Sequence, residues 1–305
     1  MAIFLKKNKR VFIIGLTTIV VFVAIFFIFF NKGVVLEVTK EKIPTDYSAT
    51  LNEIQAKSYY VYDVNEQKVL FAKNEHQTLP LASITKLMTG LVATDVMPDT
   101  TIIEIGKDAI MQEGDSGLIL GEKWTLKNLL DFSLITSSND GIYAIASALN
   151  KYESANGKNS IGLMNSKAKE LGLNDTIFSN ATGLDINGQM SGSYSSAYDV
   201  SKLLENIIKN NPEIISKTNK EKIKITSENN IIHTAINTDE SINDIPGIFA
   251  SKTGFTDLAG GNLAIAFDAG IVHPVIVIVL GSTQDGRFTD IETLANLTLQ
   301  KISEN

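Results

Sequence analysis

The stretch at residues 79–95, LPLASITKLMTGLVATD, decides how the chain is interpreted. Most of it consists of Leu, Ile, Met, Val and Ala, which predicts the start of a buried helix. It also contains Ser83 and Lys86, and because residues three apart share one face of a helix, the amine can reach the hydroxyl. A serine nucleophile needs an adjacent base, and a lysine can serve when burial lowers its pKa. The alternative is a capping serine and a lysine whose amine extends to solvent.

Spacing alone does not decide between these two interpretations of Ser83 and Lys86. A second S-x-x-K copy occurs at Ser166 and Lys169 in NSKAKELG, where the neighbouring charges are typical of a solvated helix face. The interpretation of the first copy therefore depends on what else the sequence contains.

A second motif, Ser137-Ser138-Asn139, lies in LITSSNDG between two apolar helical stretches. S-x-N is a weak pattern, and it recurs four more times in the chain. Only the copy at Ser137 lies at the junction of two apolar helices, where a short polar loop is held rigidly. The alternative interpretation is a helix-end turn with a capping residue.

A third motif, Lys252-Thr253-Gly254, occurs once in the chain, at the end of the predicted strand GIFASKTG. A lysine there can anchor a carboxylate, and the threonine adds a hydroxyl donor. The glycine removes side-chain bulk where a substrate strand could lie along the sheet edge. The alternative is a polar strand end with a turn glycine.

Predicted strands lie at both ends of the folded part, and predicted helices lie between them. SYYVYDVNEQKVLFAKN alternates apolar and polar residues around an Asn65-Glu66 turn, which predicts a β-hairpin. Strands return at GIFASKTG, GNLAIAFDAG and HPVIVIVLGS, before a final helix over residues 289–302. Apolar residues at helical spacing occur in TLKNLLDFSLIT, GIYAIASALN, IGLMNSKAKELG and SSAYDVSKLLENII, the last with a capping-box spacing at Ser196 and Asp199. We therefore predict an α/β fold of the α+β type, with one antiparallel sheet built from both ends and covered by helices.

Residues 11–30, VFIIGLTTIVVFVAIFFIFF, stand apart because they contain no charged residue. A helix of this length spans roughly 30 Å, the thickness of a bilayer core. Four Lys and Arg residues within positions 6–10 precede it, so the positive-inside rule places the N-terminus in the cytoplasm and the rest of the chain outside. A cleaved signal peptide is the alternative, but FFNKGVV offers no small-residue cleavage site.

The expected organisation is a basic tail at 1–10, a single transmembrane helix at 11–30, a tether at 31–55 and one folded domain at 56–305. Residues 1–32 carry five of the 27 Lys and Arg residues and none of the 34 acidic ones, so the remainder has a net charge of −12. An acidic exterior domain without a basic patch is a poor nucleic-acid binder. The absence of cysteine excludes disulfides, thiolate metal sites, cysteine nucleophiles and a lipoprotein anchor.

The motif order S-x-x-K, S-x-N, K-T-G is typical of penicillin-binding proteins and class A β-lactamases. The chain resembles the low-molecular-mass penicillin-binding proteins that act as serine D-alanyl-D-alanine carboxypeptidases, over most of residues 56–302. The resemblance rests on LASITKLMT, SSNDG, ELGLNDTIFSNATGLD, SSAYD, KTGFTDLAGG and the GRF at 286–288. It implies a β-lactamase/transpeptidase-like fold, in which a helical region accompanies the sheet.

The resemblance also implies a role for each motif residue. Ser83 is expected to be acylated, Lys86 to be its general base and Ser137 to relay a proton. The oxyanion hole is expected from the backbone N–H groups of Ser83 and Phe255. The remaining residues are expected to bind the substrate peptide and its terminal carboxylate: Asn139, Lys252, Thr253, Gly254 and Arg287. For the arginine, a surface turn residue is the alternative.

The implied reaction removes the terminal D-alanine from peptidoglycan stem peptides through an acyl-serine intermediate, without a metal or organic cofactor. β-Lactams are the expected covalent inhibitors, and the expected location is the bacterial cell membrane with the catalytic domain outside it. Phe255 stands where relatives have histidine or tyrosine, which leaves substrate orientation there open. We expect no downstream β-rich domain or C-terminal amphipathic anchor as in many relatives, with the N-terminal segment in place of that anchor.

Three other interpretations remain open. A class A β-lactamase needs a glutamate in an E-x-x-L-N loop, and Glu170 begins such a spacing in ELGLN. This glutamate ends a helical stretch and is expected to face solvent, and the same residues fit the LGL-x-x-T-x-F element of the carboxypeptidases. A Ser-His-Asp hydrolase is disfavoured because His76, His233 and His273 lie in unremarkable contexts and no G-x-S-x-G occurs. A non-catalytic domain that binds peptidoglycan stems or a partner is the third.

Overall fold

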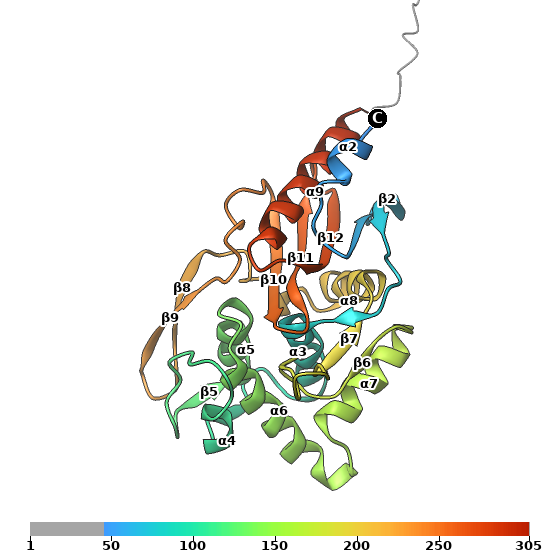
Figure 1. Cartoon of the computed structure of the whole chain (residues 1–305). Helices are drawn as coiled ribbons and strands as arrows, with labels where there is room; N and C mark the ends of the chain where they lie inside the picture. The colour runs from blue at the N-terminus through green and yellow to red at the C-terminus, as the bar shows by residue number, and fades with distance from the viewer. Residues whose placement is uncertain (1–45, 305) are drawn as a thin grey trace, which may run out of the picture. The chain divides into compact units, whose positions relative to one another are not determined.

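A five-stranded antiparallel sheet lies at the centre of the folded unit, which begins at Tyr47 (Figure 1). The structure is a computed structural model, and it describes residues 46–304. The strand order is β10 (Ile248–Thr256), β11 (Gly260–Asp268), β12 (Pro274–Ser282), β1 (Ser58–Asp63) and β2 (Lys68–Lys73). The first two strands thus pair with the last three, which confirms the prediction of one sheet built from both ends.

Helices cover both faces of this sheet, and the strand sequences show why. In a strand, successive side chains point to opposite faces. Leu263, Ile265 and Phe267 of β11 pack with α9 (Gly286–Ser303), whereas Ala264 and Ala266 belong to the core on the other face. That second face is covered by α8 (Ala197–Asn210), on the opposite side of the sheet from α9 in Figure 1.

The helical region begins with α3 (Thr85–Val96), which is the centre of the larger core. Every residue of this helix from Thr85 to Ala93 is buried, so it packs against neighbours on all sides. The helices around it are α5 (Leu126–Ile135), α6 (Asn139–Glu153) and α7 (Ser160–Glu170), together with the short α4 (Lys107–Ile110). All the long helices predicted from apolar spacing are therefore present.

Several short elements were not predicted. A 3₁₀ turn, η1 (Ala82–Ile84), precedes α3, and two further 3₁₀ turns are η2 (Ser154–Asn156) and η3 (Pro212–Ile214). Two separate two-stranded sheets pair β4 (Ile102–Glu104) with β5 (Lys123–Thr125) and β8 (Lys222–Thr226) with β9 (Ile232–Ile236). A small sheet joins β3 (Leu79–Pro80), β7 (Ser193–Ser195) and β6 (Ile177–Phe178). Within the predicted tether, the structure has a short helix, α2 (Ser48–Leu51).

The capping box predicted at the start of α8 is only half formed. Ser196 Oγ accepts a hydrogen bond from the backbone N–H of Asp199 at 3.2 Å, as predicted. The Asp199 carboxylate does not turn back to Ser196. It accepts hydrogen bonds from Asp175 N at 2.7 Å and Thr176 Oγ1 at 2.8 Å, and so ties a neighbouring loop to the helix.

In residues 46–304 no helix is long and apolar enough to cross a membrane. The predicted transmembrane segment at 11–30, the basic tail before it and most of the tether lie outside the described residues.

Candidate active site

Ser83 and Lys86 meet at the junction of η1 and α3. Lys86 Nζ lies 2.5 Å from Ser83 Oγ, 2.7 Å from Asn139 Oδ1 and 2.9 Å from the carbonyl oxygen of Thr182. The Lys86 side chain is fully buried, so its amine does not reach solvent. The structure therefore places the amine against the hydroxyl and excludes the alternative of a lysine extended to solvent.

Burial of Lys86 favours the neutral form of its amine. Removal of the amine from water, with the nearby Lys252 cation adding to it, holds the pKa of Lys86 well below its usual value. A neutral amine has two N–H donors and one lone pair. The oxygens of Asn139 and Thr182 can only accept, so they take both donors, and the lone pair is left for the Ser83 hydroxyl proton. The surroundings of the amine thus prepare it to act as a base toward Ser83.

The S-x-N motif occupies the turn between α5 and α6, as predicted. Ser137 has a φ of 58°, a left-handed conformation that is uncommon for residues other than glycine, asparagine and aspartate. Its Oγ accepts a hydrogen bond from Lys252 Nζ at 2.8 Å, while Asn139, the first residue of α6, contacts Lys86. Within the described residues, no hydrogen bond joins Ser137 to Ser83 or Lys86.

The K-T-G motif lies in β10, an edge strand that pairs only with β11 in the described sheet. Gly254 faces η1 so closely that a Cβ atom there would lie 2.8 Å from the Leu81 carbonyl oxygen and 3.2 Å from the Ser83 backbone nitrogen. This packing brings the Ser83 N–H beside the strand segment that carries the N–H of Phe255. The Phe255 side chain is 42% exposed and borders the site.

Cationic groups dominate the far end of the site. Arg287, near the start of α9, is buried, and its Nη1 donates a hydrogen bond to the Gly254 carbonyl at 2.9 Å. Burial lowers the pKa of Lys252 to about 7, and the Arg287 cation adds to this, against an opposing effect of Asp239. The Asp239 oxygens are already taken by the hydroxyls of Ser241 and Ser251. The arrangement therefore favours an incoming anion, such as a carboxylate.

The family of the chain follows from a comparison with known proteins. The family model for D-alanyl-D-alanine carboxypeptidases matches residues 44–284, which is most of the chain and includes every motif residue except Arg287. The chain belongs to the D-alanyl-D-alanine carboxypeptidase family.

Two curated members of this family are similar to the chain over most of its length. D-alanyl-D-alanine carboxypeptidase DacF of Bacillus subtilis is 31% identical over 242 residues, which are 76% of this chain and 59% of that protein. DacD of Escherichia coli is 32% identical over 263 residues, which are 81% of this chain and 63% of that protein. The chain thus spans about 60% of the length of these relatives.

A solved structure supports the same assignment. Penicillin-binding protein D2 from Listeria monocytogenes, in its ampicillin-bound form, superimposes with a TM-score of 0.66 at 26% identity. The match covers 80% of this chain and 98% of that one. The predicted resemblance to the penicillin-binding carboxypeptidases is therefore confirmed.

Glu170, the residue that suggested a class A β-lactamase, lies outside the site formed by the three motifs. Its side chain is 65% exposed at the end of α7 and pairs with Lys167 at 3.1 Å. The second S-x-x-K copy, at Ser166 and Lys169, is exposed on the same helix, as predicted. Neither motif therefore contributes to the site.

The three histidines of this carboxypeptidase-family chain do not form a triad with Ser83. His233 contacts Glu122 at 2.8 Å, His273 contacts Asp63 at 2.7 Å and His76 contacts Asp175 at 3.4 Å. In residues 46–304 no group of three or more His, Asp and Glu side chains is placed to hold a metal ion. The structure thus gives no support to a Ser-His-Asp hydrolase.

Three residues of the site were not predicted. Thr182 contributes a backbone carbonyl to Lys86, Thr238 Oγ1 bonds Thr253 Oγ1 at 2.5 Å, and the Glu113 carbonyl accepts from Asn139 Nδ2 at 2.7 Å. Thr182 lies in FSNATGLD, a stretch that carried the resemblance, so its position could have suggested a role. The other two contacts join segments that are distant in the sequence, and no sequence pattern indicates such contacts.

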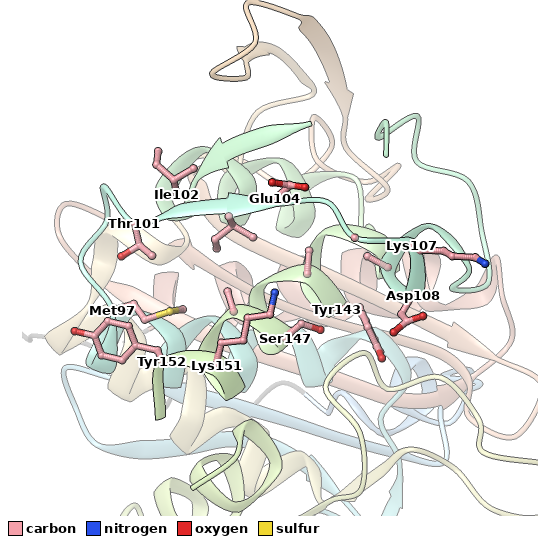
Figure 2. A pocket seen from close by; sticks show the side chains of 15 residues that line it. Met97, Thr101, Ile102, Glu104, Lys107, Asp108, Tyr143, Ser147, Lys151 and Tyr152 are labelled. Atoms are coloured by element: carbon pink, nitrogen blue, oxygen red, sulfur yellow. The ribbon is translucent and has the colours of Figure 1, made fainter. Parts of the chain in front are cut away.

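Cavities accompany the site but do not all belong to it. A cavity of about 270 Å³ adjoins Ser137 and Asn139 and is bounded by residues 114–116. A larger one, of about 580 Å³, lies between β4 and α6, where Tyr143, Ser147 and Lys151 line it (Figure 2). None of the predicted site residues lines this larger cavity.

Proposed function

We propose that the chain is a serine D-alanyl-D-alanine carboxypeptidase that removes the terminal D-alanine from peptidoglycan stem peptides. The observation that carries the proposal is the contact of 2.5 Å between Ser83 Oγ and the buried Lys86 amine. A buried neutral amine in this position supplies the base that a serine nucleophile requires. Family membership supports the substrate class, because the similar curated proteins are named as D-alanyl-D-alanine carboxypeptidases.

In the proposed acylation step, Ser83 Oγ attacks the carbonyl carbon of the penultimate D-alanine while its proton passes to Lys86 Nζ. The carbonyl oxygen becomes an oxyanion that the backbone N–H groups of Ser83 and Phe255 stabilise. The bond to the terminal D-alanine nitrogen then breaks, and the proton moves to this leaving amine, with Ser137 as the relay. In the second step Lys86 takes a proton from a water whose oxygen attacks the acyl carbon. The bond from this carbon to Ser83 Oγ then breaks, and Lys86 returns the proton to Oγ.

The substrate would bind along β10, whose outer edge is free in the described sheet. Lys252 and Arg287 supply positive charge for its terminal carboxylate, with Thr253 as a hydroxyl donor and Asn139 beside the substrate amide. Gly254 lets this strand approach η1, because a Cβ there would lie 2.8 Å from the Leu81 carbonyl oxygen. Recognition of a free carboxylate is what distinguishes an exopeptidase from an enzyme that acts on internal bonds.

The full chain in detergent, incubated with a stem pentapeptide, tests this proposal by mass spectrometry. We expect the loss of one alanine from the peptide with the wild-type chain and no loss with Ser83→Ala. Ser166→Ala, in the exposed second motif copy, is the matched control and should retain full activity. A wild-type chain that binds penicillin but leaves the pentapeptide intact would contradict the carboxypeptidase proposal.

Inhibition by β-lactams follows from the same chemistry, because a penicillin presents an amide carbonyl and a carboxylate to the site. We expect a fluorescent penicillin to label the wild-type chain covalently and to leave Ser83→Ala unlabelled. The label should persist for much longer than one catalytic cycle. Rapid release of hydrolysed penicillin would instead favour a β-lactamase, and absence of labelling would favour a non-catalytic domain.

We further propose that residues 11–30 anchor the chain in the bacterial cell membrane with the catalytic domain outside. The apolar length and the preceding basic residues support this orientation. Protease added to intact spheroplasts should then digest the domain. Protection of the domain until lysis would contradict the orientation.

A further inference from the structure

Asp140 is a buried carboxylate that the proposed chemistry does not use. It directly follows Asn139 in the first turn of α6 and is 2% exposed. Its Oδ2 accepts a hydrogen bond from Ser116 Oγ at 3.0 Å, and its Oδ1 has no hydrogen-bond partner within the described part of the chain. Burial raises the pKa of this carboxyl. A half-satisfied buried carboxylate costs stability, so its presence calls for an explanation.

Capping of α6 does not provide that explanation. The cap is already formed by Ser138, whose Oγ accepts from Gly141 N at 3.0 Å. Asp140 instead fixes which hydroxyl donates and which accepts in the hydrogen bond between Ser116 and Ser138. Ser116 Oγ donates to the Oδ2 atom of Asp140. The hydroxyl of Ser138 then donates to Ser116 Oγ across 2.7 Å, so a single arrangement of the two protons gives both hydroxyls an acceptor.

Ser116 belongs to the segment at residues 113–117, and a backbone carbonyl of this segment also contacts the active-site residue Asn139. The Glu113 carbonyl accepts from Asn139 Nδ2 at 2.7 Å. With its NH₂ group held there, Asn139 presents its oxygen to Lys86 Nζ. The segment contains two glycines with left-handed backbones, Gly114 at φ 88° and Gly117 at φ 80°. Because glycine is conformationally permissive, a segment of this kind needs side-chain contacts to keep one conformation.

We propose that Asp140 is a positioning residue for the general base. Through Ser116 it holds residues 113–117 against the start of α6. The Glu113 carbonyl in that segment orients the Asn139 amide, whose oxygen in turn fixes the Lys86 amine toward Ser83. This inference rests on the proposed function, because it assumes that Lys86 accepts the proton of Ser83.

The chain contains a matched control in Asp199. This carboxylate is 1% exposed, lies in the first turn of α8, and ties a loop to its helix through Thr176 Oγ1. Burial raises its pKa too. Its loop makes no hydrogen bond to Ser83 or Lys86 within the described residues. Loss of either carboxylate should therefore destabilise the fold, but only loss of Asp140 should affect the chemistry.

The first measurement is the second-order rate constant of labelling by fluorescent penicillin, expressed per folded molecule. We expect Asp140→Ala and Ser116→Ala each to lower it tenfold or more, since a small displacement of a catalytic group is enough for such a loss. The double variant should lose little more than either single one, because both act through one contact. Asp140→Asn, which keeps an accepting oxygen, should recover part of the rate. Asp199→Ala should stay within twofold of wild type.

The second measurement is amide hydrogen exchange over residues 113–117, which does not depend on activity. Exchange there should accelerate in Asp140→Ala and remain unchanged in Asp199→Ala. Unchanged exchange, or wild-type labelling per folded molecule in Asp140→Ala, would overturn the positioning role. Absence of labelling in the wild-type chain would instead overturn the proposed function, and with it the assumption about Lys86.

Discussion

Lys86 and Lys169 occupy the same place in two copies of one motif, and their surroundings alone separate them. Lys169 is exposed on α7, where its side chain is solvated. Lys86 is buried among three oxygen atoms, from Ser83, Asn139 and Thr182. The S-x-x-K spacing could predict that hydroxyl and amine share a face. It could not predict which copy lies in the core, and the apolar residues around Ser83 supplied that information.

Replacement of Lys86 by arginine tests whether the amine acts as a base. Arginine keeps the positive charge but stays protonated at every accessible pH, so it cannot accept the Ser83 proton. We expect Lys86→Arg to abolish labelling by fluorescent penicillin, with a loss of at least a hundredfold in rate, on the order of base-catalysis effects. Lys169→Arg is the control and should label normally. If a folded Lys86→Arg chain is still labelled, Lys86 does not act as a base and its role is structural.

Lys252 predicts an upper pH limit for activity. Burial, together with the Arg287 cation, lowers the pKa of this amine to about 7. In the free protein Lys252 therefore loses its positive charge as pH rises through that value. Because the cation attracts the substrate carboxylate, kcat/KM for the pentapeptide should fall on the alkaline side of about pH 7. In Lys252→Arg this fall should move to higher pH, since the guanidinium keeps its proton. A fall at the same pH in both chains would assign it to another group.

At the scale of elements, the sequence predicted the helices and strands whose hydrophobic pattern reflects burial in the main core. The hairpin of β1 and β2 and the strands β10 to β12 alternate or run apolar, and α5 to α9 show helical spacing. The hairpin of β8 and β9 was missed because it forms a separate two-stranded sheet, with Ile232 and Ile236 largely exposed. The residues of η1 were predicted as the start of the following helix, because no change in residue type marks the boundary between this 3₁₀ turn and α3.

The contact between β10 and η1 predicts the effect of adding one methyl group. In Gly254→Ala the new Cβ would lie 2.8 Å from a backbone oxygen that cannot move aside easily. The strand must then shift away from Ser83, which widens the oxyanion site. We expect at least a tenfold lower labelling rate and a loss of roughly 1–3 kcal/mol in unfolding free energy. Gly106→Ala, where a Cβ meets nothing within 4 Å, should change neither quantity appreciably.

At the scale of the whole molecule, the pairing of β1 with β12 brings the two ends of the folded unit together. The order of predicted elements was enough to foresee this sheet, because strands at both termini had to find partners. The start of the unit was less accessible to prediction. Tyr47 lies in the predicted tether, yet its ring packs edge-on against Phe71 at 5.4 Å and its hydroxyl bonds Glu304 at 2.9 Å. A polar stretch with a single aromatic residue predicts a linker, and not part of a folded unit.

The burial of two lysine amines makes folding of this chain a proton-releasing reaction. In the unfolded chain both amines hold their protons up to about pH 10.5, whereas in the folded chain Lys252 loses its proton near 7 and burial holds the pKa of Lys86 well below its usual value. The unfolded state therefore binds more protons over this interval, and the free energy of unfolding should rise with pH, by up to about 1.4 kcal/mol per pH unit for each lysine.

Chemical denaturation between pH 7 and 9 measures this slope. Lys252→Met should unfold with a shallower dependence on pH, because one releasing group is gone, and an unchanged slope would show that Lys252 is charged in the folded state. Above about pH 10.5, where the unfolded lysines also lose their protons, the gain should end and then reverse, since the raised pKa of Tyr60, about 12, favours the unfolded phenolate. A chain built this way is most stable at alkaline pH, and acidification weakens the fold while it adds a proton to Lys252.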